Sequence, residues 1–232
     1  MPEADRALLS KSELFRGVRE QDVDALLDRF ALRELASGDE VYRQGETTDA
    51  ELYVLLAGRI AITRRTDSGR GRSELIGPGE VFGELSVLDP GPRERTASAM
   101  VESSCAVLAG ADYLGWALPR QYVAERLLRV LARRLRRTDD EALDLLFVDV
   151  GARLAKALCD LANRFGQPTS SGVLVDHGLS QQQLAEMVGT SRETLNKQLN
   201  SFANRGWLTS GRGLLVIRNP ERLARRAAIS EA

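Results

Sequence analysis

Polar side chains cluster on one face of a predicted helix near residues 191–204. Positions three and four apart share a helix face, and this face carries Arg192, Glu193, Asn196 and Lys197. Arg and Lys donate hydrogen bonds to guanine, and Glu accepts one from the amino group of cytosine. These side chains therefore have the chemistry to read base edges in the major groove of DNA.

Two helices joined by a tight turn are expected to position this face. Ser180 can cap the first helix, with Gln183 closing a capping box, Gly189 ends that helix, and Ser191 can cap the second. The inner face of the second helix is apolar and consists of Leu195, Leu199 and Phe202. One such helix is often only a solvated surface, but the whole order of caps, turn and apolar face is typical of a helix-turn-helix.

The segment after the second helix predicts a wing and adds positive charge. Residues 207–209 and 214–217 read as two strands joined by Gly211-Arg212-Gly213. From residue 180 to the end there are eight Lys or Arg and four Asp or Glu, in a chain whose net charge is −1. Because phosphate binding requires a local basic excess, we expect double-stranded DNA as a partner. Gln181 and Ser191 join the reading face as expected DNA contacts.

The 232 residues are long enough for more than one domain, and the predicted fold class is α+β. Residues 1–118 combine short β-like runs with frequent Gly turns, which is typical of an antiparallel barrel or roll. Residues 119–147 read as one long helix, and residues 148–232 hold the winged helix-turn-helix. Further expectations are short helices at 11–15, 20–30 and 111–117, a helix at 152–165, and a loop at 166–172.

The long helix carries an apolar seam. Its members follow alternating steps of four and three, and they are Ala124, Leu128, Leu131, Leu135, Thr138, Ala142 and Leu145. A lone stripe can simply pack on its own domain, but a narrow seam flanked by many arginines favours a parallel partner helix, and so a homodimer. A hydroxyl in an apolar seam costs stability unless something satisfies it, so Thr138 is a candidate ligand contact.

Composition excludes several classes of protein. No stretch approaches eighteen apolar residues and the first residues form no apolar signal core, so we expect a cytoplasmic protein without membrane contact. Cys105 and Cys159 are isolated and His177 is the only histidine, so we expect no metal site. No nucleophile, base and orienting group converge, so no catalytic residue is assigned and an enzyme is not expected.

The segment from residue 79 to residue 98 contains a candidate anion cradle. FGELS at 82–86 reads as a turn of helix opened by Gly83, and Arg95 and Thr96 follow about ten residues later. Free amides at a helix start, with an Arg and a hydroxyl, can bind a phosphate. A carboxylate beside them, Glu84, can accept from a sugar hydroxyl. Such Gly-rich turns more often serve only as turns.

Taken together, these motifs resemble the cAMP receptor protein/FNR superfamily of bacterial transcription regulators. The motifs are FGELS with RTASA (82–86 and 95–99), LLRVLARRLRRT (127–138), and VGTSRETLNKQL with RGW (188–199 and 205–207). The last three look closest to the actinobacterial cAMP-receptor-like branch. The likeness covers nearly the whole chain. It implies a cyclic-nucleotide-binding β-roll, a dimerising helix and a winged helix-turn-helix acting on a palindromic operator with RNA polymerase.

The resemblance also implies roles for single residues. Gly83 and Glu84 would meet the ribose of cAMP, and Leu85 and Ser86 would offer amides to its cyclic phosphate. Arg95 and Thr96 match the family's phosphate-binding pair. Thr138, with Asp139 of a second copy, would contact the adenine. Arg192, Glu193 and Lys197 match base-reading positions.

One departure from the pattern leaves the effector open. Relatives run from Pro-Gly-Pro directly into Arg-Thr, whereas here Arg93-Glu94 precedes Arg95-Thr96. Either arginine can be the phosphate ligand, and Glu94 adds negative charge. The alternative is therefore a regulator of the same family that needs no effector or answers another nucleotide, such as a cyclic dinucleotide.

Overall fold

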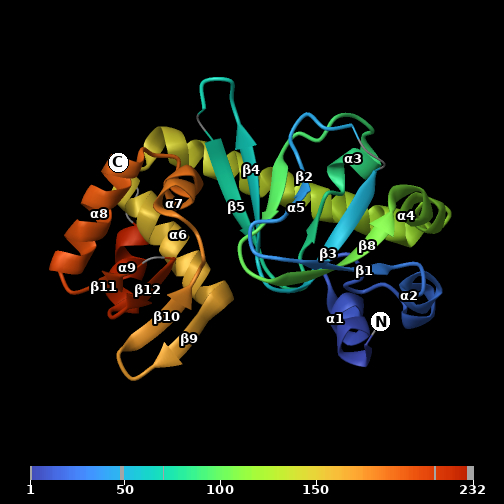
Figure 1. Ribbon diagram of the computed structural model, residues 1–232, viewed down its shortest axis with the longest axis horizontal. Coiled ribbons are helices and arrows are strands. Elements are labelled where there is room, and N and C mark those ends of the chain that lie inside the picture. The colour runs from blue at the N-terminus through green and yellow to red at the C-terminus, as the bar shows by residue number, and fades with distance from the viewer. Residues whose placement is uncertain (1, 48–49, 70, 212, 229–232) are drawn as a thin grey trace. The chain divides into compact units, whose positions relative to one another are not determined.

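The computed structural model describes residues 2–47, 50–69, 71–211 and 213–228, and the chain has two compact units. The first unit comprises Met1–Arg64 and Glu74–Arg134, and the second comprises Arg65–Ser73 and Leu135–Ala232. Figure 1 labels their elements. No helix of the described ranges has both the length and the apolar character needed to cross a membrane. The three-part division expected at residues 118 and 147 stays a prediction.

Two four-stranded antiparallel sheets form the roll, and most of their residues belong to the first unit. The first has the order β1 (Ala31–Leu35), β8 (Ser103–Ala109), β3 (Glu51–Ala57), β6 (Val81–Phe82). The second has the order β2 (Glu40–Tyr42), β7 (Thr96–Ala99), β4 (Ile60–Arg65), β5 (Gly71–Ile76). Antiparallel strands joined by Gly turns are what the sequence predicts within residues 1–118.

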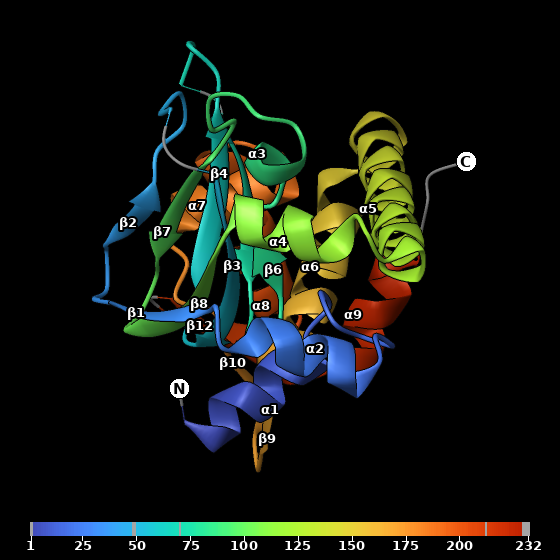
Figure 2. The ribbon, with the colours of Figure 1, turned by 90° about the vertical axis from the view of Figure 1, so that its right-hand side faces the viewer.

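Strand β3 is buried on both faces, so it carries a continuous apolar run rather than an alternating one. Tyr53 and Leu55 belong to the core that also includes Ile60 and Ala97 of the second sheet. Leu52, Val54 and Leu56 alternate with these residues along β3 and pack against the helices. Figure 2 shows α2 (Glu20–Leu27) and α4 (Gly110–Ala117) in front of the first sheet.

The first helix differs from the expectation. α1 spans Glu3–Lys11, and the expected helix at 11–15 is a series of turns. Ser12 ends α1 because its amide bonds to the carbonyl of Leu9 in a tighter turn. Phe15 then packs edge-on against Trp116, with 5.7 Å between the ring centroids. Phe15 is apolar because it is buried in the core, and not because it belongs to the apolar face of a helix.

The long helix α5 spans Gln121–Phe147, close to the predicted limits. Its only buried residue is Val123, near its start. Several leucines of its apolar seam are exposed, among them Leu128 at 66%, Leu135 at 63% and Leu145 at 41%. The stripe therefore does not pack on the chain's own first unit along its whole length.

The second unit contains a helical group and a small sheet. Besides the part of α5 from Leu135 onward, its helices are α6 (Val150–Phe165), α7 (Gln181–Val188), α8 (Arg192–Asn204) and α9 (Pro220–Ala227). The sheet has the order β11 (Leu208–Ser210), β12 (Leu214–Ile217), β10 (Gly172–Asp176), β9 (Gly166–Thr169). The predicted wing is β11 with β12, although Arg212 of its turn lies outside the described residues.

The loop expected at 166–172 is instead largely a strand. β9 pairs with β10, and the projecting hairpin is visible in Figure 1. Its sequence, Gly-Gln-Pro-Thr, has little strand propensity. The strand therefore forms because it pairs with β10, and the local sequence does not predict that pairing.

Candidate anion cradle and DNA-reading helix

The cradle comprises Gly83–Ser86, Arg95 and Thr96. Gly83 follows β6 with a φ of 79°, and a Cβ on it would lie 2.9 Å from the ring of Tyr53 and 3.0 Å from the carbonyl oxygen of Glu51. Only glycine fits there without strain. The chain then enters α3 (Leu85–Leu88), where Glu84 is the N-cap residue. The amides of Leu85 and Ser86 lie in the first turn, where no intrahelical acceptor exists.

Arg93 is committed to the structure of the roll. Its side chain is buried and donates to the carbonyl of Gly83 at 2.9 Å and to that of Glu51 at 3.1 Å. Its guanidinium also lies 4.3 Å from the centre of the Tyr42 ring. Arg93 therefore stabilises the turn at Gly83 through these two hydrogen bonds.

Arg95 differs from Arg93 in what it contacts. It forms an ion pair with Glu74 at 3.5 Å, and its side chain is 38% exposed. Its Nε is buried and has no hydrogen-bond partner in the described part of the chain. A buried donor without a partner is costly, so this N–H is suited to an added acceptor. The Oγ of neighbouring Thr96 accepts from the amide of Gln44 at 3.0 Å.

Glu94, the extra acidic residue, lies at the surface of the roll. It forms a long ion pair with Arg64 at 3.8 Å, and its side chain is 60% exposed. Its charge is therefore screened by water. The two-residue excess in the sequence thus inserts one buried arginine and one solvated carboxylate before Arg95.

Glu84 is held by an arginine that the sequence analysis did not single out. Its Oε1 lies 2.5 Å from Nη1 of Arg134, while Nη2 of Arg134 lies 2.7 Å from Glu13 and donates to the carbonyl of Val81 at 3.2 Å. Burial by itself would lower the pKa of Arg134, but the carboxylates of Glu84 and Glu13 outweigh it and raise that pKa. No sequence pattern separates Arg134 from the other arginines of α5, because its role depends on its contacts with Glu84 and Glu13.

Thr138 and Asp139, the expected adenine contacts, are exposed on α5 and belong to the second unit. Thr138 already has an interaction partner within its own chain. That Thr138 and Asp139 contact the adenine of a nucleotide bound in the cradle stays a prediction.

The helix-turn-helix has the expected caps. Ser180 and Gln183 form a capping box at the start of α7, and Gly189 ends α7 in the left-handed conformation with a φ of 70°. Ser191 caps α8 because its Oγ accepts from the amide of Thr194 at 3.1 Å. Leu195, Leu199 and Phe202 are buried.

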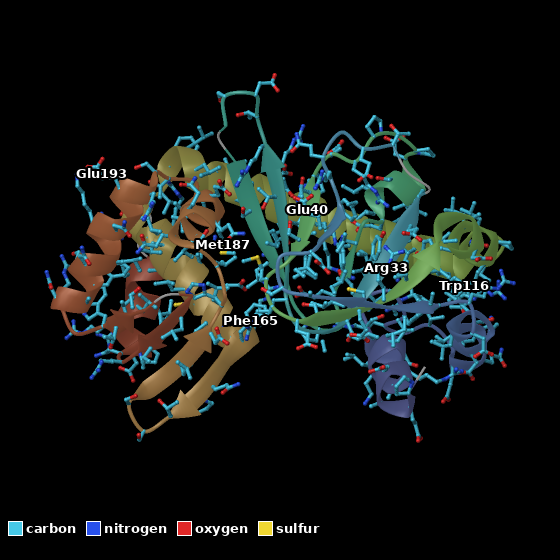
Figure 3. The ribbon with its side chains drawn as sticks, viewed as in Figure 1. Arg33, Glu40, Trp116, Phe165, Met187 and Glu193 are labelled. Carbon is cyan, nitrogen blue, oxygen red and sulfur yellow. The ribbon has the colours of Figure 1, made fainter. Side chains whose placement is uncertain are left out.

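The expected reading side chains share one exposed surface. The Oε1 of Gln181 accepts from Arg192 Nε at 3.3 Å and from Asn196 Nδ2 at 3.2 Å. Lys197 forms an ion pair with Glu193 at 2.9 Å, and the side chains are 72% and 80% exposed. Figure 3 shows Glu193 at the outer edge of α8. Neither pairing buries the groups, so both leave them available to DNA.

The remaining reactive residue types have structural roles. His177 is buried, and its Nδ1 accepts from the amide of Leu179 at 3.1 Å. Burial raises the pKa of the Cys105 thiol to about 12, which leaves it protonated and unreactive. In the described ranges no group of three or more His, Cys, Asp or Glu is placed to hold a metal ion.

Comparison with known proteins gives two domain matches. Residues 32–116 match the cyclic nucleotide-binding domain, and residues 152–226 match the Crp-like helix-turn-helix domain. The first match contains the cradle, and the second contains the whole helix-turn-helix.

Similar proteins extend over nearly the whole chain. The "CRP-like cAMP-activated global transcriptional regulator" of Mycobacterium tuberculosis is 40% identical over 95% of this chain and 98% of its own. The "Cyclic AMP receptor protein" of Thermus thermophilus is 35% identical, covering 89% and 93%. The solved structure of FixK2 from Bradyrhizobium japonicum has a TM-score of 0.74 at 23% identity, covering 87% and 98%.

Proposed function

The chain belongs to the family of CRP-like transcriptional regulators, and we propose that it acts as a homodimer whose effector is cAMP. It is a DNA-binding transcription regulator with an α+β fold, a cyclic nucleotide-binding domain and a C-terminal helix-turn-helix. The family consists of regulators, so the prediction that the chain is not an enzyme is confirmed. The effector, the dimer and the roles of single residues belong to the proposal.

The buried, unpartnered Nε of Arg95 is the observation that carries the effector proposal. A cyclic phosphate is an anion, and a charge-assisted hydrogen bond from Arg95 would offset its removal from water. The amides of Leu85 and Ser86 supply the further donors that a helix start offers. The relatives from M. tuberculosis and T. thermophilus carry cAMP in their names, which favours this nucleotide.

The sugar and base would be recognised by different parts of the chain. Glu84 would accept from the ribose hydroxyl, with Gly83 leaving room beside it. Such a contact competes with the ion pair between Glu84 and Arg134. Thr138 of α5 and Asp139 of the second copy would meet the adenine, as the family resemblance implies.

The exposed seam of α5 supports the homodimer. Leu128 and Leu135 are more than 60% exposed, which is unusual for leucines that share one helical stripe. A second copy of α5 packed in parallel would bury them. Two copies present two reading helices, so the operator would be a pseudo-palindrome with half-sites about one helical turn apart.

Within each half-site, Arg192, Glu193 and Lys197 would read bases, with Gln181, Ser191 and Asn196 supporting them or meeting phosphate. Transcription regulation at such an operator implies contact with RNA polymerase and a cytoplasmic location. Both are part of the proposal.

Calorimetric titration of the full-length protein with cAMP, cGMP and a cyclic dinucleotide, side by side, tests the effector. Binding of cAMP with higher affinity than the other two is the expected result. Preference for the cyclic dinucleotide would replace cAMP with that effector. No binding up to millimolar concentration, together with unaltered operator binding, would favour the effector-independent regulator.

A further inference from the structure

A cavity of about 100 Å³ lies in the first unit between α5, α4 and the segment after α1. Its lining includes Tyr113, Val123, Leu127 and Val130, which make an apolar wall. Glu84 of the cradle lines it, but Gly83, Leu85, Ser86, Arg95 and Thr96 do not, so the cavity adjoins the cradle without coinciding with it. An apolar cavity of about 150 Å³ in another protein holds a molecule of benzene, so this one has room for a body of a few carbon atoms.

The charged groups around this cavity are unbalanced. Glu13 and Glu84 line it, and both are already paired with Arg134. Arg16, Arg126 and Arg133 also line it, and none of them has a carboxylate partner among the described residues. Four guanidinium groups therefore face two carboxylates, which leaves an excess of two positive charges for an anion to meet.

The backbone is shaped to hold one of these arginines. A Cβ at Gly17 would lie 2.5 Å from Nη1 of Arg126, so the guanidinium lies against the glycine itself. Gly17 has a φ of 75°, a conformation that side chains disfavour. Arg126 and Arg133 are seven residues apart, so both project from the same side of α5. Val123, Leu127 and Val130 form the adjacent inward stripe.

We propose that this cavity binds a small carboxylate with an apolar body of about four to five carbon atoms. The body packs against Val123, Leu127 and Val130, and the carboxylate accepts hydrogen bonds from Arg126 and Arg133. A neutral molecule of the same shape leaves the excess positive charge unpaired. The cavity shares Glu84 with the cradle, but Arg126 and Arg133, which would hold the carboxylate, are not cradle residues, so the carboxylate acts as a second effector beside the nucleotide. The binding itself does not depend on which nucleotide the cradle takes.

Calorimetric titration of the full-length protein with hexanoate, acetate and 1-hexanol tests the proposal. Hexanoate should bind at least tenfold more tightly than either of the other two, because only hexanoate has both the apolar body and the charge. The double variant Arg126→Gln, Arg133→Gln should weaken hexanoate at least tenfold. Arg136→Gln is the matched control, because Arg136 is exposed on the same helix and does not line the cavity.

A second variant tests the place of binding. Val130→Phe should fill the cavity and abolish hexanoate binding, while circular dichroism and nucleotide binding show that the roll remains folded. Equal affinity for hexanoate and 1-hexanol, no measurable hexanoate binding, or equal losses in the double variant and the control would each overturn the proposal. Loss of hexanoate binding in Arg95→Ala would also overturn it, because the anion would then occupy the cradle.

Discussion

Two arginines, at positions 93 and 95, are chemically identical in the sequence and have different surroundings in the structure. The sequence indicates that one of them binds phosphate but does not separate them, because both follow the same turn. The two arginines differ in the partners that they have in the structure. Arg93 donates to two backbone carbonyls, whereas the Nε of Arg95 has no partner in the described chain. Only long-range packing, here against Tyr42 and Glu51, decides which guanidinium is available.

Replacing Arg95 with alanine should therefore affect cAMP binding, whereas replacing Arg93 with alanine should affect the stability of the roll. Arg95→Ala should abolish cAMP binding and change the free energy of unfolding by less than about 1 kcal/mol, because its ion pair is partly solvated. Arg93→Ala leaves two carbonyl acceptors without donors and should destabilise the roll by about 2–4 kcal/mol. Calorimetry and chemical denaturation measure the two effects. A stable Arg93→Ala protein that no longer binds cAMP would reverse the assignment.

On α8, Arg192 is exposed, and its Nε donates to Oε1 of Gln181. Arg192→Ala should reduce affinity for the preferred operator by about 1–3 kcal/mol and relax the base preference at one position of each half-site. Binding to a set of operators with single-base changes, at fixed salt, measures this. Lys197→Ala offers a comparison on the same face. Equal losses on operator and random DNA would mean that Arg192 contacts only phosphate.

At the scale of elements, prediction succeeded where local chemistry determines structure. The caps Ser180 and Ser191, the turn at Gly189 and the inward leucines of α8 are all as expected, because each depends on neighbours within four residues. It failed at residues 166–169, whose strand depends on pairing with β10. It also missed buried Glu186, which accepts from the amide of the Gln182 side chain at 3.1 Å.

The capping box at the start of α7 gives a test of local stability. Ser180→Ala removes the acceptor of the Gln183 amide and should lower the free energy of unfolding by about 1 kcal/mol. Ser180→Asp should restore most of that loss, since Asp caps a helix as well as Ser does. Chemical denaturation monitored by circular dichroism measures both variants. Equal destabilisation by Ala and Asp would show that the loss does not come from the missing acceptor of the Gln183 amide.

The link between α5 and α6 is short and well bonded. Asp149 caps α6 by accepting from the amides of Gly151 at 2.8 Å and Ala152 at 3.2 Å. Arg153 donates to the carbonyl of Val148 at 2.5 Å and to that of Gly189 at 3.2 Å. Arg153 therefore links the segment between α5 and α6 to the turn of the helix-turn-helix.

At the scale of the whole molecule, the exposed seam of α5 determines the expected assembly. Leu131→Glu with Leu135→Glu places two charges in that seam and should convert a dimer into monomers at micromolar concentration. Operator affinity should fall with it, because one reading helix then meets one half-site. Sedimentation measures the mass. Arg129→Glu, on the polar side of the same helix, is the control. A wild-type protein that sediments as a monomer would contradict the proposed dimer.

Coupling between nucleotide and DNA follows if cAMP binds two arrangements of the molecule with different affinity. The cradle and the reading helix belong to different units, so a nucleotide can change operator affinity only through that difference. The coupling is reciprocal, and operator DNA should raise cAMP affinity by the factor by which cAMP raises operator affinity. A typical coupling of about 1–3 kcal/mol gives a factor of about 5–150. Titrating cAMP with and without operator, and operator with and without cAMP, measures both factors. In Arg95→Ala both coupling factors should equal one, and the operator affinity without cAMP should be unchanged. Tight cAMP binding with both factors already equal to one in the wild type would make cAMP a ligand of the roll but not the switch.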